Sequence, residues 1–202
     1  MPDESSSRVP TGAGSAADLA GREVLVGVSG GIAAFKTCAL VSALVQRGAG
    51  VTVVMTDAAT RFVGPLTFES LTARRVILDL WSAEQDRDSR HIHVTERAHL
   101  VIIAPATANV IGKMAHGIAD DALTTMVLAA PGPLLLAPAM NDRMWRNAIV
   151  QRNIEILRAA GWSIVEPESG WLACRTIGEG RMAEPQTILE TATRMLIGGG
   201  RR

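Results

Sequence analysis

Short apolar runs alternate along the chain with longer segments in which apolar residues recur at helical spacing. The apolar runs, which we interpret as strands, cover residues 22–28, 51–56, 75–81, 100–106, 133–139 and 162–168. The long helical segments cover residues 32–47, 144–160 and about 185–197, with shorter ones at 57–63, 65–73, 108–117 and 120–130. Strands that are apolar on both faces and separated by helices are typical of a parallel sheet covered on both sides.

This pattern predicts a single three-layer, doubly wound α/β domain, Rossmann-like or flavodoxin-like, with a parallel sheet of about six strands. We expect the domain over residues 21–197. Residues 1–20 are small and polar and predict a disordered tail, and residues 198–202 predict a frayed end. The sequence shows neither an internal repeat nor a second domain.

Composition narrows the class of partner. The chain of 202 residues has 20 Lys+Arg and 20 Asp+Glu, so it lacks the positive charge with which proteins bind nucleic acid. No apolar run reaches the roughly 18 residues of a membrane span, and no secretory signal is visible. Two cysteines cannot form a disulfide framework for a chain of this size. We therefore expect a cytoplasmic protein with a small-molecule ligand, and neither a nucleic acid nor a membrane as partner.

Ligands of doubly wound sheets bind beyond the carboxyl ends of the strands. After the first strand, "GVSGGIAAFKT" offers Gly30 and Gly31 for a sharp turn, Ser29 as a hydroxyl, and a following helix N-terminus, which together predict a phosphate site. The spacing matches neither the dinucleotide fingerprint nor the P-loop. A tight turn without a ligand is the alternative, and Lys36 is expected to be a solvated helix residue.

Uncharged polar residues follow the second and fourth predicted strands. Thr56 can cap a helix and also bind a phosphate or ribityl oxygen, whereas Asp57 is expected to be a helix cap. The segment "APATANV" places Thr107 and Asn109 after a very apolar strand, where amides and hydroxyls suit hydrogen bonds to a flat heterocycle. Capping of the loop alone explains this segment equally well.

The segment "APAMNDRMW" follows the fifth strand. Asn141 can cap the next helix, but Met140, Met144 and Trp145 around it make an apolar wall with one polar group, which is typical of a small-molecule site. His91 precedes the strand over 100–106 and is a candidate general base, with a surface histidine as the alternative. The "HIH" at 91–93 has no third ligand at metal spacing, so we predict no metal site. Cys38 is expected to fill a helix face.

The segment "SGWLACRTIGEGRMAEP", residues 169–185, places the second cysteine, Cys174, in a glycine-rich stretch. We expect a flap over about 168–184 that covers the strand-end site. In it, Trp171 and Leu172 would exclude water and Arg181 would meet an anionic substrate. A structural thiol is the alternative interpretation of Cys174.

Together these segments resemble the flavin-containing cysteine decarboxylase family, and within it the decarboxylases of 4′-phosphopantothenoylcysteine in coenzyme A biosynthesis. The family's "PASANT"-type segment is similar to residues 105–110, its "PAMN-x-x-MW" segment is present at 138–145, and its cysteine flap corresponds to 173–185. The family histidine of an "HI" pair falls on His91. The resemblance covers about residues 21–195.

The resemblance implies FMN as cofactor and assembly as homotrimers, or as dodecamers built from trimers, with FMN at a subunit interface. It implies a flavin that oxidises the substrate thiol to a thioaldehyde, loss of carbon dioxide, and reduction of the resulting enethiolate. His91 would assist the oxidative half, and Cys174 would supply a proton in the reductive half. The implied cofactor contacts are Ser29, Gly30, Gly31, Thr56, Ala106, Thr107, Ala108, Asn109 and Met140. The implied substrate contacts are Asn141, which would hold the carboxylate, together with Met144, Trp171, Leu172, Ala173, Arg175 and Arg181.

The chain departs from the family at Arg175, where glycine is usual, and at His99, where an acidic residue is common. Arg175 either adds a cation for the substrate phosphate or changes the backbone of the flap. Two other functions stay open: decarboxylation of a C-terminal peptide cysteine, which does not require the flap cysteine, and flavin binding without turnover.

Overall fold

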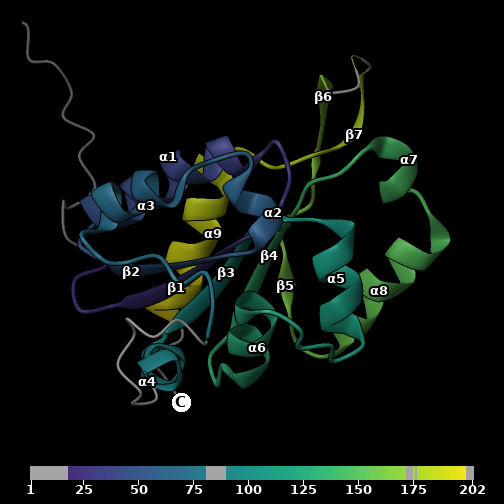
Figure 1. Cartoon of the computed structure of the whole chain (residues 1–202). Coiled ribbons are helices and arrows are strands. Elements are labelled where there is room, and N and C mark those ends of the chain that lie inside the picture. Colours follow the sequence, from purple (N-terminus) through teal and green to yellow (C-terminus); the bar gives the residue numbers. More distant parts are fainter. Residues whose placement is uncertain (1–17, 81–89, 172–174, 176, 199–202) are drawn as a thin grey trace, which may run out of the picture.

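The computed structural model describes residues 18–80, 90–171, 175 and 177–198, and is built around a five-stranded parallel sheet (Figure 1). The strands are β1 (Glu23–Val28), β2 (Gly50–Met55), β3 (Leu100–Ala106), β4 (Leu134–Pro138) and β5 (Ser163–Ile164), in the order β2-β1-β3-β4-β5. The chain first moves outward from β1 to β2, then crosses back over β1 to β3 and continues outward in the other direction, so the strand order reverses between β1 and β3. This reversal of direction opens a crevice at the carboxyl ends of those two strands.

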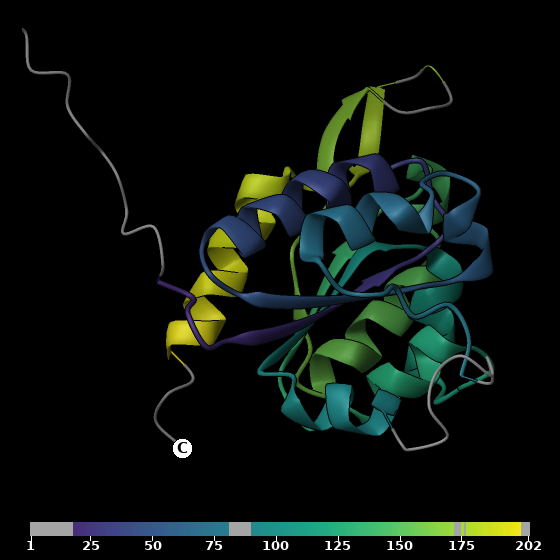
Figure 2. The same cartoon turned by 60° about the vertical axis from the view of Figure 1, so that its left-hand side comes forward.

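Helices cover both faces of the sheet (Figures 1 and 2). One face carries α1 (Ala34–Gln46), α3 (Pro65–Thr72) and α9 (Pro185–Gly198), and the other carries α4 (Arg90–Arg97), α5 (Ala108–Ala115), α6 (Ala122–Ala129) and α8 (Ala148–Ala159). Two short helices, α2 (Asp57–Thr60) and α7 (Asp142–Trp145), begin directly after β2 and shortly after β4. The predicted three-layer, doubly wound architecture is confirmed.

Strand alternation divides the core into two apolar clusters, one for each face. In β1, Val24 and Val26 pack on the α1 side, whereas Leu25 between them packs on the α6 side. The same alternation continues in β3, with Ile102 on the first side and Ile103 on the second. Burial on both faces explains why the strands are continuous apolar runs. No helix in the described part of the chain is long and apolar enough to cross a membrane.

Two predicted strands are shorter in the structure. Within its described residues 75–80, the run at 75–81 makes only one parallel bridge, between Ile77 and Val54, and the next side chain, Leu78, is 45% exposed. This run reaches the outer edge of β2 and leaves it after one residue, so the sheet has five strands and one additional bridge. The run at 162–168 pairs with β4 only through Ser163 and Ile164, followed by a single bond from the Val165 N–H to the Leu136 carbonyl.

The predicted N-terminal tail over 1–20 is wrong at its last residues. Leu19 is fully buried, its N–H donates to the Arg47 carbonyl at 3.0 Å, and Asp18 forms an ion pair with Arg47. The ordered domain therefore includes residues 18–20. Residues 1–17 and 199–202 lie outside the described part of the chain.

The predicted flap is a β-hairpin, formed by β6 (Glu168–Trp171) and the antiparallel β7 (Ile177–Arg181). It projects from the sheet layer beside α7 (Figures 1 and 2). The Met140 N–H donates to the Gly180 carbonyl at 2.9 Å, which docks β7 onto the loop between β4 and α7. Gly180 has φ of +125°, and a Cβ there would lie 2.4 Å from the Met140 carbonyl oxygen. This close approach requires glycine.

Arg175 lies in the turn of the hairpin with φ of +64°, in the left-handed region that favours glycine. The glycine that the resemblance expects at this position therefore has a conformational reason. The Arg175 side chain is exposed, so of the two alternatives the described contacts favour an effect on the backbone of the hairpin.

We expect Gly180→Ala to lower the free energy of unfolding by about 1–3 kcal/mol, because the new Cβ meets a backbone oxygen in an unfavourable conformation. The control is Gly112→Ala in α5, whose Cβ would lie 3.6 Å from the Asn153 amide nitrogen. This control should be stabilising by about 0.5–1 kcal/mol. Chemical denaturation of both variants tests the docking, and a Gly180→Ala protein as stable as the parent would contradict it.

We expect Arg175→Val to weaken the hairpin, because a β-branched residue is less tolerated than arginine in the left-handed region. Backbone amide exchange in Ile177–Arg181 should become about tenfold faster than in the parent. Arg175→Gly, the matched control, should change exchange by less than about threefold. Equal exchange in the two variants would show that the conformation of residue 175 does not limit the order of the hairpin.

Candidate active site

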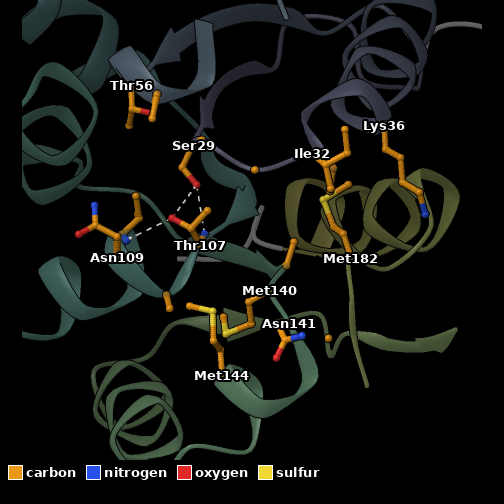
Figure 3. Close-up of a pocket in the computed structure, with 18 of the residues that line it drawn as sticks. Ser29, Ile32, Lys36, Thr56, Thr107, Asn109, Met140, Asn141, Met144 and Met182 are labelled. Carbon is orange, nitrogen blue, oxygen red and sulfur yellow. Dashed lines mark hydrogen bonds between the residues drawn. The ribbon is translucent and has the colours of Figure 1, made fainter. Parts of the chain in front are cut away.

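A cavity of about 1110 Å³ lies at the carboxyl ends of β1, β3 and β4, under the hairpin. Its volume is slightly above the roughly 300–1,000 Å³ typical of small-molecule sites. The cavity brings together predicted residues that are far apart in sequence: Ser29, Gly30, Gly31, Thr56, Thr107, Ala108, Asn109, Met140, Asn141, Met144, Trp171 and Arg181. Figure 3 shows Thr56 and Asn109 on one side of Ser29 and Thr107, and Ile32, Lys36 and Met182 on the other.

The loop between β1 and α1 forms a cradle of backbone amides. A Cβ at Gly30 would lie 2.3 Å from the Cβ of Ala58, so only glycine permits the close approach of this loop to α2. The N–H groups of Gly30, Ile32 and Ala33 donate to no acceptor among the described residues. Amides of this kind, next to the N-terminus of α1, suit an anion such as a phosphate.

The Ser29 hydroxyl joins the carboxyl ends of β1 and β3. It donates to the Pro105 carbonyl at 2.7 Å, accepts the Thr107 N–H at 3.1 Å, and lies 3.2 Å from the Thr107 Oγ1 (Figure 3). The residue is only 1% exposed. The Ser29 hydroxyl therefore holds the cradle in place through β3. Although Ser29 lines the cavity, the groups of the loop that are available to a ligand are mainly backbone amides.

Three helix caps hold polar side chains at the cavity wall. Thr56 caps α2 by accepting the Ala59 N–H, Thr107 caps α5, and Asn141 caps α7 by accepting the Arg143 N–H at 2.9 Å. The expected cap at Asp57 is wrong, because Thr56 takes that role and Asp57 is exposed. All three residues cap a helix and also line the cavity, so the cap does not exclude the predicted role in binding, which stays a prediction.

The apolar wall contains Met140 and Met144 as predicted, but Trp145 belongs to the core. Trp145 is 9% exposed and packs in the cluster beneath α5 and α8. Met182, Ile32 and Phe35 line the cavity instead. Ile32 and Phe35 follow the cradle directly and are 57% and 59% exposed, so their position next to the glycines was the signal available in the sequence. Cys38 is partly buried against the core, and burial raises the pKa of its thiol.

Lys36 is not the solvated residue that its helix position predicts. Its side chain is 13% exposed, lines the cavity, and pairs with Glu184 at 3.0 Å. Arg181 pairs with the same Glu184 oxygen. The hydrogen bond from Lys36 holds the pKa of the Glu184 carboxyl below its ordinary value. Sequence reasoning missed this pair because its members lie 148 residues apart.

The predicted catalytic residues are not described at the cavity. Leu172, Ala173 and Cys174 lie outside the described residues, between Trp171, which lines the cavity, and Arg175. His91 belongs to α4, but its side chain is not described. Figures 1 and 2 both show α4 beside α6, at the end of the molecule opposite the hairpin. The roles of Cys174 and His91 therefore stay predictions.

The described site fits a flavin nucleotide. The amide cradle offers a place for a phosphate, and the adjoining wall of Ala108, Met140 and Met144 offers apolar surface for a flat ring. Thr107 and Asn109 add uncharged polar groups at the same edge. In the described part of the chain, no group of three or more His, Cys, Asp or Glu side chains is placed to hold a metal ion.

Solved structures with this fold include flavin enzymes. A PPC decarboxylase mutant complexed with pantothenoylaminoethenethiol has a TM-score of 0.74 and 32% identity, over 85% of this chain and 96% of that one. The FMN-dependent cysteine decarboxylase SpaF has a TM-score of 0.74 and 33% identity, over 89% and 98% of the two chains.

Curated relatives are longer than this chain. The coenzyme A biosynthesis bifunctional protein CoaBC of Bacillus subtilis is 51% identical over 174 residues, and the CoaBC of Escherichia coli is 45% identical over 174 residues. These matches cover 86% of this chain and 43% of each relative, so the chain spans less than half of their length. The Flavoprotein family matches residues 14–197, and the chain belongs to this family.

Proposed function

We propose that this chain is an FMN-dependent decarboxylase that converts 4′-phosphopantothenoylcysteine to 4′-phosphopantetheine in the cytoplasm. The observation that carries the proposal is the convergence of the amide cradle, the apolar wall and Asn141 in one cavity under the hairpin. The identity of 51% to a coenzyme A biosynthesis protein supports the choice of substrate.

The geometry of the cavity supports a set of contacts for FMN. The backbone amides of the cradle at Gly30, Ile32 and Ala33, together with Thr56, would hold the phosphate next to Gly31, and Ser29 would keep the cradle in place. Thr107, Ala108, Asn109 and Met140 would contact the ring. The predicted contact at Ala106 is not supported, because Ala106 is fully buried in the core and does not line the cavity. Bound FMN supplies an oxidant for the substrate thiol, which creates the electron sink that decarboxylation needs.

Asn141 would orient the substrate carboxylate. The helix cap takes the amide oxygen, which accepts the Arg143 N–H, so the N–H₂ group is the part of the side chain that meets an acceptor. An uncharged amide positions a carboxylate without the strong ground-state stabilisation that an arginine would add, and this favours the loss of carbon dioxide. The remaining substrate contacts that we propose are Met144, Trp171, Leu172, Ala173 and Arg181, whereas Arg175 would act through the backbone of the hairpin.

The proposed reaction needs two proton transfers by side chains of this chain, one before and one after the loss of carbon dioxide. A carboxylate next to an unactivated carbon has no place for the electrons that carbon dioxide leaves behind, so the thiol must first become a thioaldehyde. His91 would assist this oxidation by removing a proton. After carbon dioxide leaves, Cys174 would donate a proton as the enethiolate is reduced to the product thiol.

The position of α4, which carries His91, indicates how copies of the chain would assemble. Because α4 lies opposite the hairpin, His91 would reach a cavity most directly from a second copy of the chain. Ile32, Phe35 and Trp171 line the mouth of the cavity and are each more than half exposed. Such a patch is typical of a protein interface. We therefore propose a homo-oligomer, a trimer or a dodecamer of trimers, whose cavities lie between copies.

The purified protein should carry a yellow flavin and release carbon dioxide from 4′-phosphopantothenoylcysteine. Mass spectrometry should show a product lighter by one carbon dioxide, with no further loss of two hydrogens. A peptide that ends in cysteine is the control substrate. Turnover of the peptide alone would favour a peptide cysteine decarboxylase, flavin without any turnover would favour a binding protein, and the absence of flavin would contradict all three functions.

We expect Cys174→Ser to decarboxylate the substrate but to accumulate the enethiol, lighter by two hydrogens than the normal product, because the proton for the reductive half is missing. A cysteine-to-serine mutant of a PPC decarboxylase is known in complex with pantothenoylaminoethenethiol, a compound of this kind. Cys38→Ser is the matched control and should form normal product. Normal product from Cys174→Ser would show that Cys174 is not the proton donor.

Mixed oligomers test whether two copies share a site. His91→Asn should retain flavin but lose the oxidative step. When His91→Asn and Cys174→Ser chains are co-expressed, about one quarter of randomly assembled shared sites contain both intact residues, since each is supplied by a different copy. Reduced product should therefore reappear. If each cavity took both residues from its own chain, the mixture would form no reduced product.

A further inference from the structure

The charges that line the cavity are unevenly distributed. Among the described lining residues, Lys113 faces two carboxylates, Asp120 at 2.7 Å and Asp121 at 3.8 Å. At the base of the hairpin the ratio within the ion pairs is reversed, because Lys36 and Arg181 both pair with one carboxylate, that of Glu184. The Glu168 carboxylate lies nearby, where it accepts the Glu184 N–H.

Glu184 fixes both cations, and the described hydrogen bonds leave further N–H donors of each side chain available to a ligand. Lys36 comes from α1 and Arg181 from the end of β7, and both bind the same Oε1 atom of Glu184. The Glu184 N–H in turn donates to the Glu168 carboxylate at 3.2 Å, which fixes the segment that carries the shared carboxylate. A lysine has three N–H donors and an arginine has five, and the described hydrogen bonds use one of each.

This pair lies away from the proposed flavin contacts. Figure 3 shows Lys36 next to Met182, on the opposite side of Ser29 and Thr107 from Thr56 and Asn109. Asn141 lies separately, close to Met140 and Met144. A ligand with one anionic end at Asn141 and a second at Lys36 would therefore cross the apolar wall of methionines.

The proposed substrate has this chemistry. Its carboxylate and its phosphate monoester lie at opposite ends of an uncharged arm. A phosphate that leaves water needs cations and several charge-assisted hydrogen bonds, which an uncharged amide cannot provide. Lys36 and Arg181 offer both, whereas Lys113 is already paired with two acids.

We propose that Lys36 and Arg181, bridged by Glu184, form the subsite for the substrate phosphate and select phosphorylated over unphosphorylated pantothenoylcysteine. This inference rests on the proposed function and assigns the substrate end that is remote from the reacting cysteine. Glu184 is a positioning residue, because it orients the two cations and would not itself contact the phosphate.

Binding of two products tests the subsite apart from turnover. Calorimetry on the flavin-loaded protein should show 4′-phosphopantetheine binding at least about tenfold more tightly than pantetheine, a preference that one charge-assisted contact supplies. Lys36→Met should reduce this preference by about tenfold, while Lys36→Arg should keep most of it. The matched control is Arg146→Met, which removes a cation that pairs with the hairpin residue Glu179 at 3.6 Å and should leave the preference unchanged.

Inorganic phosphate gives a test that needs no variant. It should weaken the binding of 4′-phosphopantetheine to the flavin-loaded wild-type protein and leave the binding of pantetheine unaffected. Equal loss of affinity for both products in Lys36→Met, or equal competition by phosphate against both, would show that the cations only dock the hairpin and would overturn the subsite.

Failure of the subsite and failure of the proposed function give different results. A protein that prefers the phosphorylated product but releases no carbon dioxide would overturn the decarboxylase and keep the subsite. A protein that decarboxylates the phosphorylated and unphosphorylated substrates equally well would overturn the subsite alone. A protein that binds neither product and releases no carbon dioxide from the substrate would overturn both.

Discussion

The rest of the site depends on one close junction, in which the carboxyl ends of β1 and β3 meet α2, the helix that follows β2. Ser29 binds the Pro105 carbonyl and the Thr107 N–H, so β1 and β3 end at the same level on either side of the crevice. Thr37, one turn into α1, donates to the Ala104 carbonyl at 2.8 Å and fixes the helix on the same strand. Gly30 allows α2 to approach within contact of the loop. Because these contacts use buried side chains and backbone, the cradle is rigid and its outward amides are held ready for an anion.

The second half of the site depends on a weaker attachment. An isolated two-stranded hairpin is marginally stable in water, and β6–β7 gains support from the Met140–Gly180 hydrogen bond and from the ion pairs of Glu184. The pKa of Glu184 is lowered, chiefly by Lys36, so its pairing stabilises the folded hairpin above the ordinary pKa of glutamate. This contribution is lost as the pH falls through the lowered pKa, because the protonated acid no longer pairs with the cations.

The sequence was sufficient for the sheet and for most of the cavity. Parallel strands buried on both faces are apolar throughout, and their carboxyl ends converge, so reading the residues after each strand located Thr56, Thr107 and Asn141 together. The apolarity of a segment does not reveal how many residues pair with a neighbouring strand, which is why the run at 75–81 was predicted as a full strand of the sheet. Trp145 was wrongly placed at the cavity because the helical face that meets the core depends on tertiary packing.

Long-range charge pairs could not be predicted from the sequence, because they also depend on tertiary packing. Nothing near Lys36 distinguishes it from a surface lysine, since its partner Glu184, directly before α9, is brought to it by the packing of α9 on α1. Arg181, which pairs with the same carboxylate, links ligand binding to the order of the hairpin. A ligand that contacts Arg181 binds only the docked hairpin, so it stabilises that state by mass action, in proportion to its concentration relative to its dissociation constant. Substrate recognition at Lys36 and Arg181 and the placement of Trp171 over the cavity are therefore parts of one equilibrium.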